Sequence, residues 1–221
     1  MKKNCNIPKS LSFGLTVAAV IIGFIAYPLL PPAVATHWNA AGIADGYGPS
    51  WFGAFVFPAL MALVLLLWVV IPKLVVFKSN FESFDKQYWI LGATMQVYFM
   101  LFFGMTIAPN FGYMFDFAKA VIVTIGLLFI VIGGLMPSFK RNFFVGIRTP
   151  WTLSSDTVWE KTHEFGGKLF IAAGIISIAS ILLPGVSVFV AVIAVLAASL
   201  AAVGYSFIIF KKEGTAKKKT K

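Results

Sequence analysis

The chain has 221 residues, of which 59% are hydrophobic and only 12% are charged. Soluble domains carry about 25% charged residues, so this chain lacks the polar side chains that cover a water-facing surface, and its 23 Phe and 6 Trp argue against disorder. The formal net charge of +10 would suggest nucleic-acid binding in a soluble protein, but in a membrane protein it indicates which side each loop faces. The single cysteine, Cys5, allows no intramolecular disulfide and no thiolate metal site.

Six apolar stretches are candidates for membrane spans, because a helix of about 20 apolar residues crosses the roughly 30 Å hydrocarbon core of a bilayer. They are 10–30, 51–71, 88–108, 117–136, 168–183 and 186–210. Only Pro184 and Gly185 separate the last two, so we expect a tight helical hairpin there. The sequence therefore predicts an all-α membrane protein built as a bundle of six transmembrane helices.

The first stretch also has features of a signal peptide. A basic segment with Lys2, Lys3 and Lys9 precedes it, and Ala33-Val34-Ala35 has the small-x-small pattern of a cleavage site. Its apolar part is longer than the usual ~7–15 residues of a signal peptide. We therefore predict an uncleaved signal anchor.

Lys and Arg are distributed unevenly among the loops. All but one of the 18 lie in the N-terminal tail, the second loop, the fourth loop with the start of the fifth helix, and the C-terminal tail, and the exception is Lys119. Because basic loops stay on the cytoplasmic side, we predict cytoplasmic termini and a multi-pass location in the bacterial plasma membrane. The predicted parts are four helices over 1–136 with an external loop at 31–50, a cytoplasmic loop with a short helix over 137–167, a helical hairpin over 168–210 and a basic cytoplasmic tail over 211–221.

The external loop at 31–50 carries polar and aromatic side chains between turn signals such as Asp45-Gly46 and Gly48-Pro49. One interpretation is a structured cap lying on the helix ends. The other is a recognition surface for an extracellular ligand, whose candidate contacts are His37, Trp38, Asn39, Asp45 and Tyr47. One His and one Asp eight residues apart are only a weak signal for a metal site.

The second and third loops suggest no chemistry. The second, with three Lys and several Phe, is interpreted as an interfacial connector. In the third, Asp116 stands just before a predicted helix, where its charge suits the positive end of the helix dipole.

The fourth loop, 137–167, combines basic residues with Phe and Trp. Ser155 and Asp156 predict a helix start, and a short helix over 156–165, ended by Gly166-Gly167, would place Trp159 and His163 on one face. Such a segment could lie in the lipid headgroup layer, or it could be a cytoplasmic docking platform for a protein partner. Candidate docking residues are Lys140, Arg141, Asn142, Arg148, Thr149, Trp151, Thr152, Trp159 and His163.

Few polar groups lie within the spans. No Asp, Glu or His lies at membrane depth, so a proton relay is not indicated, and Gln96 serves either as a helix–helix contact or as a substrate ligand. A stripe of small residues, Ala194, Ala198, Ala202 and Ser206, permits close packing within the chain or in a homodimer. No catalytic triad, phosphate-binding loop, zinc motif or dinucleotide motif occurs, so we predict no enzymatic activity, no cofactor and no metal.

Two segments resemble the SdpI-type immunity family of bacterial integral membrane proteins. In the first half, Thr36-His37-Trp38-Asn39, Gly42, Asp45-Gly46-Tyr47-Gly48 and Pro58 look like the domain of unknown function found in such proteins. In the second half the resemblance lies in Met136-Pro137, Lys140-Arg141-Asn142, Phe144 through Leu153, Ser155, Val158-Trp159, Thr162-His163 and Gly166-Gly167. With the six spans, it covers nearly the whole chain apart from the basic tail.

The resemblance implies a protein that protects a cell from a secreted, membrane-active peptide toxin of the sporulation-delaying kind. It also implies a receptor that holds a transcriptional repressor at the membrane when toxin is present, without binding nucleic acid itself. The residues carried over to the docking platform by match are Arg148, Thr149, Trp151, Thr152, Trp159 and His163. A small transporter or channel using Gln96, and an interfacial membrane enzyme using Glu160 and His163, are the alternative hypotheses.

Overall fold

The computed structural model describes residues 6–74 and 78–219; Lys2, Lys3 and Cys5 lie outside them. The helices are α1 (Asn6–Ala26), α2 (Ser50–Val70), α3 (Lys78–Ser83), α4 (Asp85–Ile107), α5 (Phe117–Leu135), α6 (Pro150–Ser154), α7 (Asp156–Ala179) and α8 (Ser187–Lys219), and the strands are β1 (Ala33–Trp38) and β2 (Ala44–Pro49). Six helices, α1, α2, α4, α5, α7 and α8, are long and apolar enough to cross a membrane. The six predicted spans are thus confirmed.

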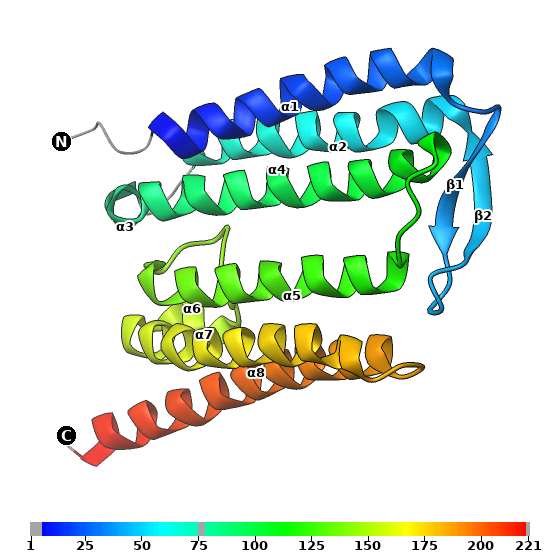
Figure 1. Ribbon diagram of the computed structural model, residues 1–221. Coiled ribbons are helices and arrows are strands. Elements are labelled where there is room, and N and C mark those ends of the chain that lie inside the picture. The colour runs from blue at the N-terminus through cyan, green and yellow to red at the C-terminus, as the bar shows by residue number, and fades with distance from the viewer. Residues whose placement is uncertain (1–5, 75–77, 220–221) are drawn as a thin grey trace.

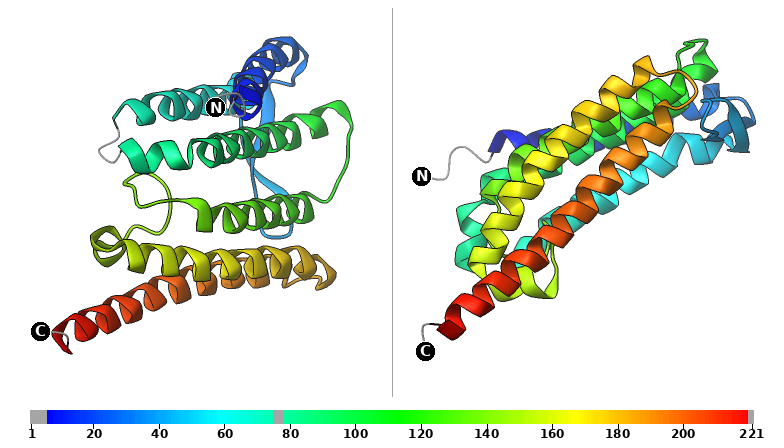
Figure 2. Two further views of the ribbon diagram at one scale, coloured as in Figure 1. Left: turned by 90° about the vertical axis from the view of Figure 1, so that its left-hand side faces the viewer. Right: turned by 90° about the horizontal axis from the view of Figure 1, so that it is seen from below.

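The helices form two groups that lie side by side. Helices α1, α2 and α4 pack together, α5, α7 and α8 pack together, and α4 meets α5 between the groups (Figure 1). The β1–β2 hairpin lies at one end of the bundle, which we call the hairpin end. The start of α1 and the end of α8 lie at the opposite end, which we call the termini end, as further views also show (Figure 2).

The first group is joined by one buried amide. Gln96 of α4 is 1% exposed, and its Nε2 donates to the Met61 carbonyl of α2 at 3.1 Å, while its Oε1 accepts from Thr16 Oγ1 of α1 at 3.3 Å. A side-chain amide that binds two neighbouring helices satisfies its own polar atoms within the bundle. Gln96 is therefore a helix–helix contact. Because both polar atoms of its amide are bound within the first group, the structure gives no support to a role of Gln96 as a substrate ligand.

The second group packs through glycines. Gly126 of α5 faces Gly174 of α7, and Gly133 faces Gly167, so closely that a Cβ on any of the four would lie within 3 Å of the facing carbonyl oxygen. Helices in lipid associate through such close backbone contact. The small stripe of α8 is used in the same way, because Ala198, Ala202 and Ser206 are buried and Ala202 lies opposite Gly166 of α7. The stripe thus packs within the chain.

Two predicted boundaries are wrong. Gly166 and Gly167 do not end a short helix, because α7 continues from Asp156 to Ala179. Both glycines are buried at helix contacts, so they serve packing and not termination. The predicted cytoplasmic loop and C-terminal hairpin therefore share one helix, and the tail predicted to start at 211 continues α8 to Lys219.

The all-α prediction missed the two-stranded hairpin in the external loop. Antiparallel β1 and β2 pair Ala33 with Pro49 and Trp38 with Ala44. The strands are rich in Ala and Gly, which have low strand propensity, so the sequence gives little local signal. Tertiary contact supplies the support: Val34 is 1% exposed and packs against Gly53 of α2, where any Cβ would collide with it.

Candidate functional site

The turn of the hairpin rests on the start of α5. Asn39 Oδ1 accepts from the backbone N–H groups of Ala41 and Ile43, at 2.9 and 3.1 Å, which closes the turn. Gly42 has φ +77°, and a Cβ there would lie 3.0 Å from the backbone nitrogen of Ala118. The hairpin therefore spans from α2, in the first helix group, to α5, in the second (Figure 1).

Trp38 fixes this position, since its ring stacks on Phe117 of α5 with 3.9 Å between centroids and 9° between planes. Two cavities share this stacked pair in their linings. A cavity of about 610 Å³ lies between the hairpin turn, α5 and α8, and one of about 270 Å³ lies between β1, α2, α4 and α5. Apart from a few polar atoms of the hairpin, both linings are mainly apolar. An apolar segment of a ligand could therefore lie beside Trp38 on either side.

The polar side chains of the hairpin are open to solvent. His37 and Asp45 join the two strands through Nδ1 and Oδ1 at 2.5 Å, and their side chains are 72% and 44% exposed. Tyr47 is 66% exposed. Four of the five predicted recognition residues, His37, Trp38, Asn39 and Asp45, therefore gather near the turn, while Tyr47 lies further along β2.

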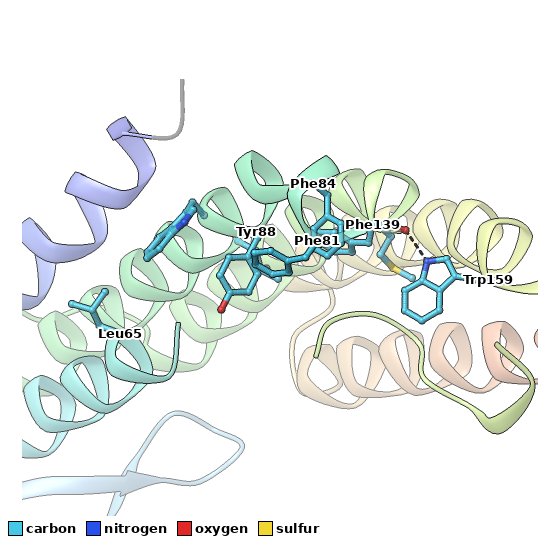
Figure 3. Close-up of a cluster of buried hydrophobic side chains, with 9 residues drawn as sticks. Leu65, Phe81, Phe84, Tyr88, Phe139 and Trp159 are labelled. Carbon is cyan, nitrogen blue, oxygen red and sulfur yellow. Dashed lines mark hydrogen bonds between the residues drawn. The ribbon is translucent and has the colours of Figure 1, made fainter. Parts of the chain in front are cut away.

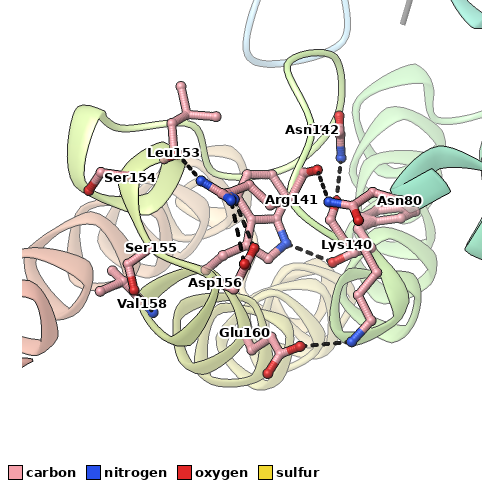
Figure 4. A network of polar contacts seen from close by, with 12 residues as sticks. Asn80, Lys140, Arg141, Asn142, Leu153, Ser154, Ser155, Asp156, Val158 and Glu160 are labelled. Atoms are coloured by element: carbon pink, nitrogen blue, oxygen red, sulfur yellow. Dashed lines mark hydrogen bonds and ion pairs between the residues drawn. The ribbon is translucent and has the colours of Figure 1, made fainter. Parts of the chain in front are cut away.

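At the termini end, the segment after α5 is held by ion pairs (Figure 4). Arg141 binds the Asp156 carboxylate through Nε at 2.8 Å and donates from a terminal nitrogen to the Leu153 carbonyl at 2.7 Å. Lys140 pairs with Glu160 at 2.7 Å, and Asn80 donates to the Arg141 carbonyl at 3.0 Å. The loop is thus connected both to α7 and to the α3 segment.

Asn142 builds the tight turn that follows. Its Oδ1 accepts from the backbone N–H groups of Phe144 and Val145, both at 2.8 Å, and its Nδ2 donates to the carbonyls of Lys140 and Val145 at 2.8 and 3.2 Å. The side chain is 1% exposed. Its polar atoms are thus bound within the chain.

Trp159 and His163 fasten this loop to α7. Trp159 Nε1 donates to the Phe139 carbonyl at 2.7 Å, and the indole belongs to the apolar cluster that joins α2, α3, α4, the segment after α5 and α7 (Figure 3). His163 stacks on Trp159 with 4.0 Å between centroids, which confirms that they share a helix face. Its Nε2 accepts from the Ile147 N–H at 3.0 Å, so Nδ1 carries the proton and donates to the Trp159 carbonyl at 2.8 Å.

The short helix α6 is held by its cap and by α8. Thr149 and Thr152 form a capping box, and Thr152 Oγ1 also donates to the Ile147 carbonyl at 2.8 Å. Trp151 donates from Nε1 to Ser206 of α8. Arg148 is exposed and donates to the Phe143 carbonyl at 2.5 Å.

These contacts correct the expected docking platform. Asn142, Thr152, Trp159 and His163 are at most 1% exposed, so a partner protein cannot reach them, and they hold the loop together instead. Arg141, Thr149 and Trp151 are half-buried, and Lys140 and Arg148 are exposed. The sequence does not show that the loop folds back onto α7 and α8, so it does not predict the burial of these side chains.

The proposed enzyme residues do not form a site. Glu160 is exposed and paired with Lys140, whereas both ring nitrogens of His163 are bound to the backbone. Among the described residues, no three His, Cys, Asp or Glu side chains gather in a way that could hold a metal ion.

Several contributors have no clear signal in the sequence. By pattern, Phe117 is only an apolar residue of a span, yet it carries the Trp38 stack. Ser155, predicted as a helix cap, does accept from the Val158 N–H at 3.3 Å, and it also donates to Glu213 of α8 at 2.7 Å. Residues 58 positions apart carry no local signal for such a contact.

Comparison with known proteins supports both halves of the resemblance. Residues 138–209 match the SdpI/YfhL protein family, and residues 14–62 match a domain of unknown function, DUF1648. The chain is 24% identical over 179 residues to the immunity protein SdpI of Bacillus subtilis (strain 168), covering 80% of each chain. No solved structure matches.

With six helices able to span a bilayer, the protein is a multi-pass protein of the cell membrane. In its second half the chain is thus similar to the SdpI/YfhL protein family.

Proposed function

We propose that this protein is an immunity protein that protects a bacterial cell from a secreted, membrane-active peptide. The observation that carries the proposal is the similarity to the immunity protein SdpI over 80% of the chain. The exposed hairpin, with apolar cavities beside Trp38, supplies a surface that suits a peptide with apolar segments.

The proposal places the hairpin end outside the cell and the termini end in the cytoplasm. The basic loops support this orientation, because the segments after α2 and after α5 lie at the termini end together with the end of α8 (Figure 1). A peptide arriving from outside would then meet His37, Asp45 and the cavity openings first.

A growth assay tests the proposal. Cells sensitive to the sporulation-delaying peptide toxin and lacking their own immunity gene should survive when they express this protein. His37→Ala and Trp38→Ala should lower survival at an unchanged amount of protein in the membrane. Tyr113→Ala is the matched control, because this exposed aromatic lies at the same end and lines neither cavity. No protection by the wild type, or an equal loss in all three variants, would contradict the proposal.

We further propose that the termini end holds a transcriptional repressor when toxin is present. The candidate contacts are the exposed Lys140 and Arg148 and the half-buried Trp151. In toxin-treated cells, Arg148→Glu should move a repressor encoded beside this gene from the membrane fraction to the cytosol, whereas Lys212→Glu should not. The absence of a repressor gene at that place would speak against this part.

A further inference from the structure

An apolar groove on the outer surface of the bundle lies between the two helix groups. It has a volume of about 410 Å³ and is lined by α1, α4 and α5, with Leu11, Ile90, Val97, Leu127 and Val131 among its walls. The groove exists because α1 and α5 both pack on α4 and make no substantial contact with each other. Within the part of the chain that the structure describes, its lining has almost no polar surface.

The length of the groove matches one leaflet of a bilayer. Along α4 it runs from Ile90 to Leu101, which at 1.5 Å per residue is about 16 Å. The hydrocarbon core is about 30 Å thick, so one leaflet is about half of that. The α4 part of the groove starts five residues after Asp85, at the termini end, and stops six residues before Ile107 at the other end of α4. A membrane-crossing helix would need a longer groove, whereas an acyl chain of one leaflet fits this depth.

Two lysines stand at the termini-end opening of the groove. Lys9 holds its ammonium 5.2 Å above the ring centre of Trp89, which directly precedes the lining residue Ile90. Lys86 lies one helical turn before Ile90 on the same face of α4. Both side chains are exposed, and neither forms an ion pair with a described carboxylate, in contrast to Lys140 and Lys168.

We propose that this groove binds an anionic phospholipid of the leaflet at the termini end. One acyl chain lies along α4 between α1 and α5, and the phosphate lies against Lys9 and Lys86. Lipid tails cover every apolar face of a membrane protein, but a three-walled groove with two cations at headgroup height favours an anionic headgroup over a neutral one. The site is separate from the cavities beside Trp38, which share no lining residue with it.

Native mass spectrometry of the full-length protein tests the site. The protein is released from membranes that contain equal amounts of phosphatidylglycerol and phosphatidylcholine. The wild type should retain phosphatidylglycerol preferentially, and Lys9→Gln/Lys86→Gln should lower this preference about tenfold. Lys161→Gln/Lys212→Gln, which removes two exposed cations of the same end away from the groove, should leave the preference unchanged.

A second pair of variants tests the acyl-chain position. Leu127→Trp, at a half-exposed wall of the groove, should reduce retained phosphatidylglycerol, and Val192→Trp, at a similarly exposed wall of the larger cavity beside Trp38, should not. The proposal is overturned if the wild type retains both lipids equally, if the two lysine pairs act alike, or if Leu127→Trp has no effect. It is also overturned if the wild type appears as a lipid-free dimer, because a second copy would then cover the groove.

Discussion

Asn39 and Asn142 stabilise turns through the same hydrogen-bond pattern, in two loops at opposite ends of the bundle. Each uses Oδ1 to accept two backbone N–H groups and so closes a turn. Asn39 is exposed, and the structure shows no bond from its Nδ2 to a described residue, whereas Asn142 is 1% exposed and binds two carbonyls as well.

The histidines and tryptophans of the two ends differ in the same way. His37 is exposed and pairs with Asp45, while His163 is fully buried with both ring nitrogens bound. Trp38 stacks on a phenylalanine beside two cavities, while Trp159 is fully buried. The same residue types thus leave polar atoms available at the hairpin end and use them for internal structure at the termini end.

The largest difference is expected for the two tryptophans. Trp159→Ala removes a fully buried ring and the hydrogen bond to Phe139, so it should lower the free energy of unfolding by about 4 kcal/mol. Trp38→Ala removes a partly exposed stack and should cost about 1 kcal/mol. Equilibrium unfolding in mixed micelles measures both. Trp159→Phe is the control, since it keeps a ring and should cost about 1–2 kcal/mol for the lost bond. Equal losses for the two alanine variants would break the comparison.

The asparagines should show a smaller contrast in the same assay. Asn142→Ala leaves buried backbone groups without partners and should cost about 2 kcal/mol, whereas around Asn39 water can replace the side chain, so Asn39→Ala should cost about 0.5 kcal/mol. The aspartate variants sharpen the test. Asn39→Asp keeps both acceptor bonds and should be tolerated, but Asn142→Asp removes the donor to Lys140 and Val145 and should not.

The sequence was sufficient for features set by local pattern. The six spans follow from runs of apolar residues, and both predicted helix starts are confirmed: Asp116 accepts from the Lys119 N–H, and Ser155 accepts from the Val158 N–H. The shared face of Trp159 and His163 follows from helix periodicity alone.

Features set by distant contacts were not predictable in this way. The hairpin depends on Val34 meeting Gly53 and on Trp38 meeting Phe117, which is 79 residues further along the chain. Gly166 and Gly167 resemble a helix stop in sequence, and only the neighbouring helices show that they provide room for packing. A motif residue alone does not show whether it recognises a partner or holds its own loop, because that depends on burial.

The acidic residues that hold the loop at the termini end should contribute less than its buried rings. Asp156→Asn weakens the bonds to Arg141, whose side chain is only 23% exposed, and should cost about 1 kcal/mol. Glu160→Gln breaks the pair with Lys140, in which both side chains are about half exposed, and should cost about 0.3 kcal/mol. Unfolding at low and high salt measures both. A larger loss for Glu160→Gln would show that the exposed pair, and not the Arg141 contacts, fastens the loop.

The smallest expected effect tests whether a polar group at the hairpin end stabilises the fold at all. The backbone N–H of Lys119, at 3.0 Å, and its ammonium, at 2.9 Å, lower the pKa of the Asp116 carboxyl. A carboxylate whose pKa is lower in the folded than in the unfolded chain adds stability above its unfolded value of about 4, and this stability disappears as the pH falls through the folded value.

Asp116→Asn keeps a helix-capping acceptor but removes the charge, so it should be less stable than the wild type by a few tenths of a kcal/mol near neutral pH. The difference should vanish in acid, where the wild-type carboxyl is also neutral. Asp116→Ala, which removes the cap itself, should cost about 1 kcal/mol near neutral pH and keep much of that deficit in acid. Unfolding followed from neutral to acidic pH separates these outcomes. A deficit of Asp116→Asn that is independent of pH would mean that the charge is not what stabilises the start of α5, where the hairpin rests.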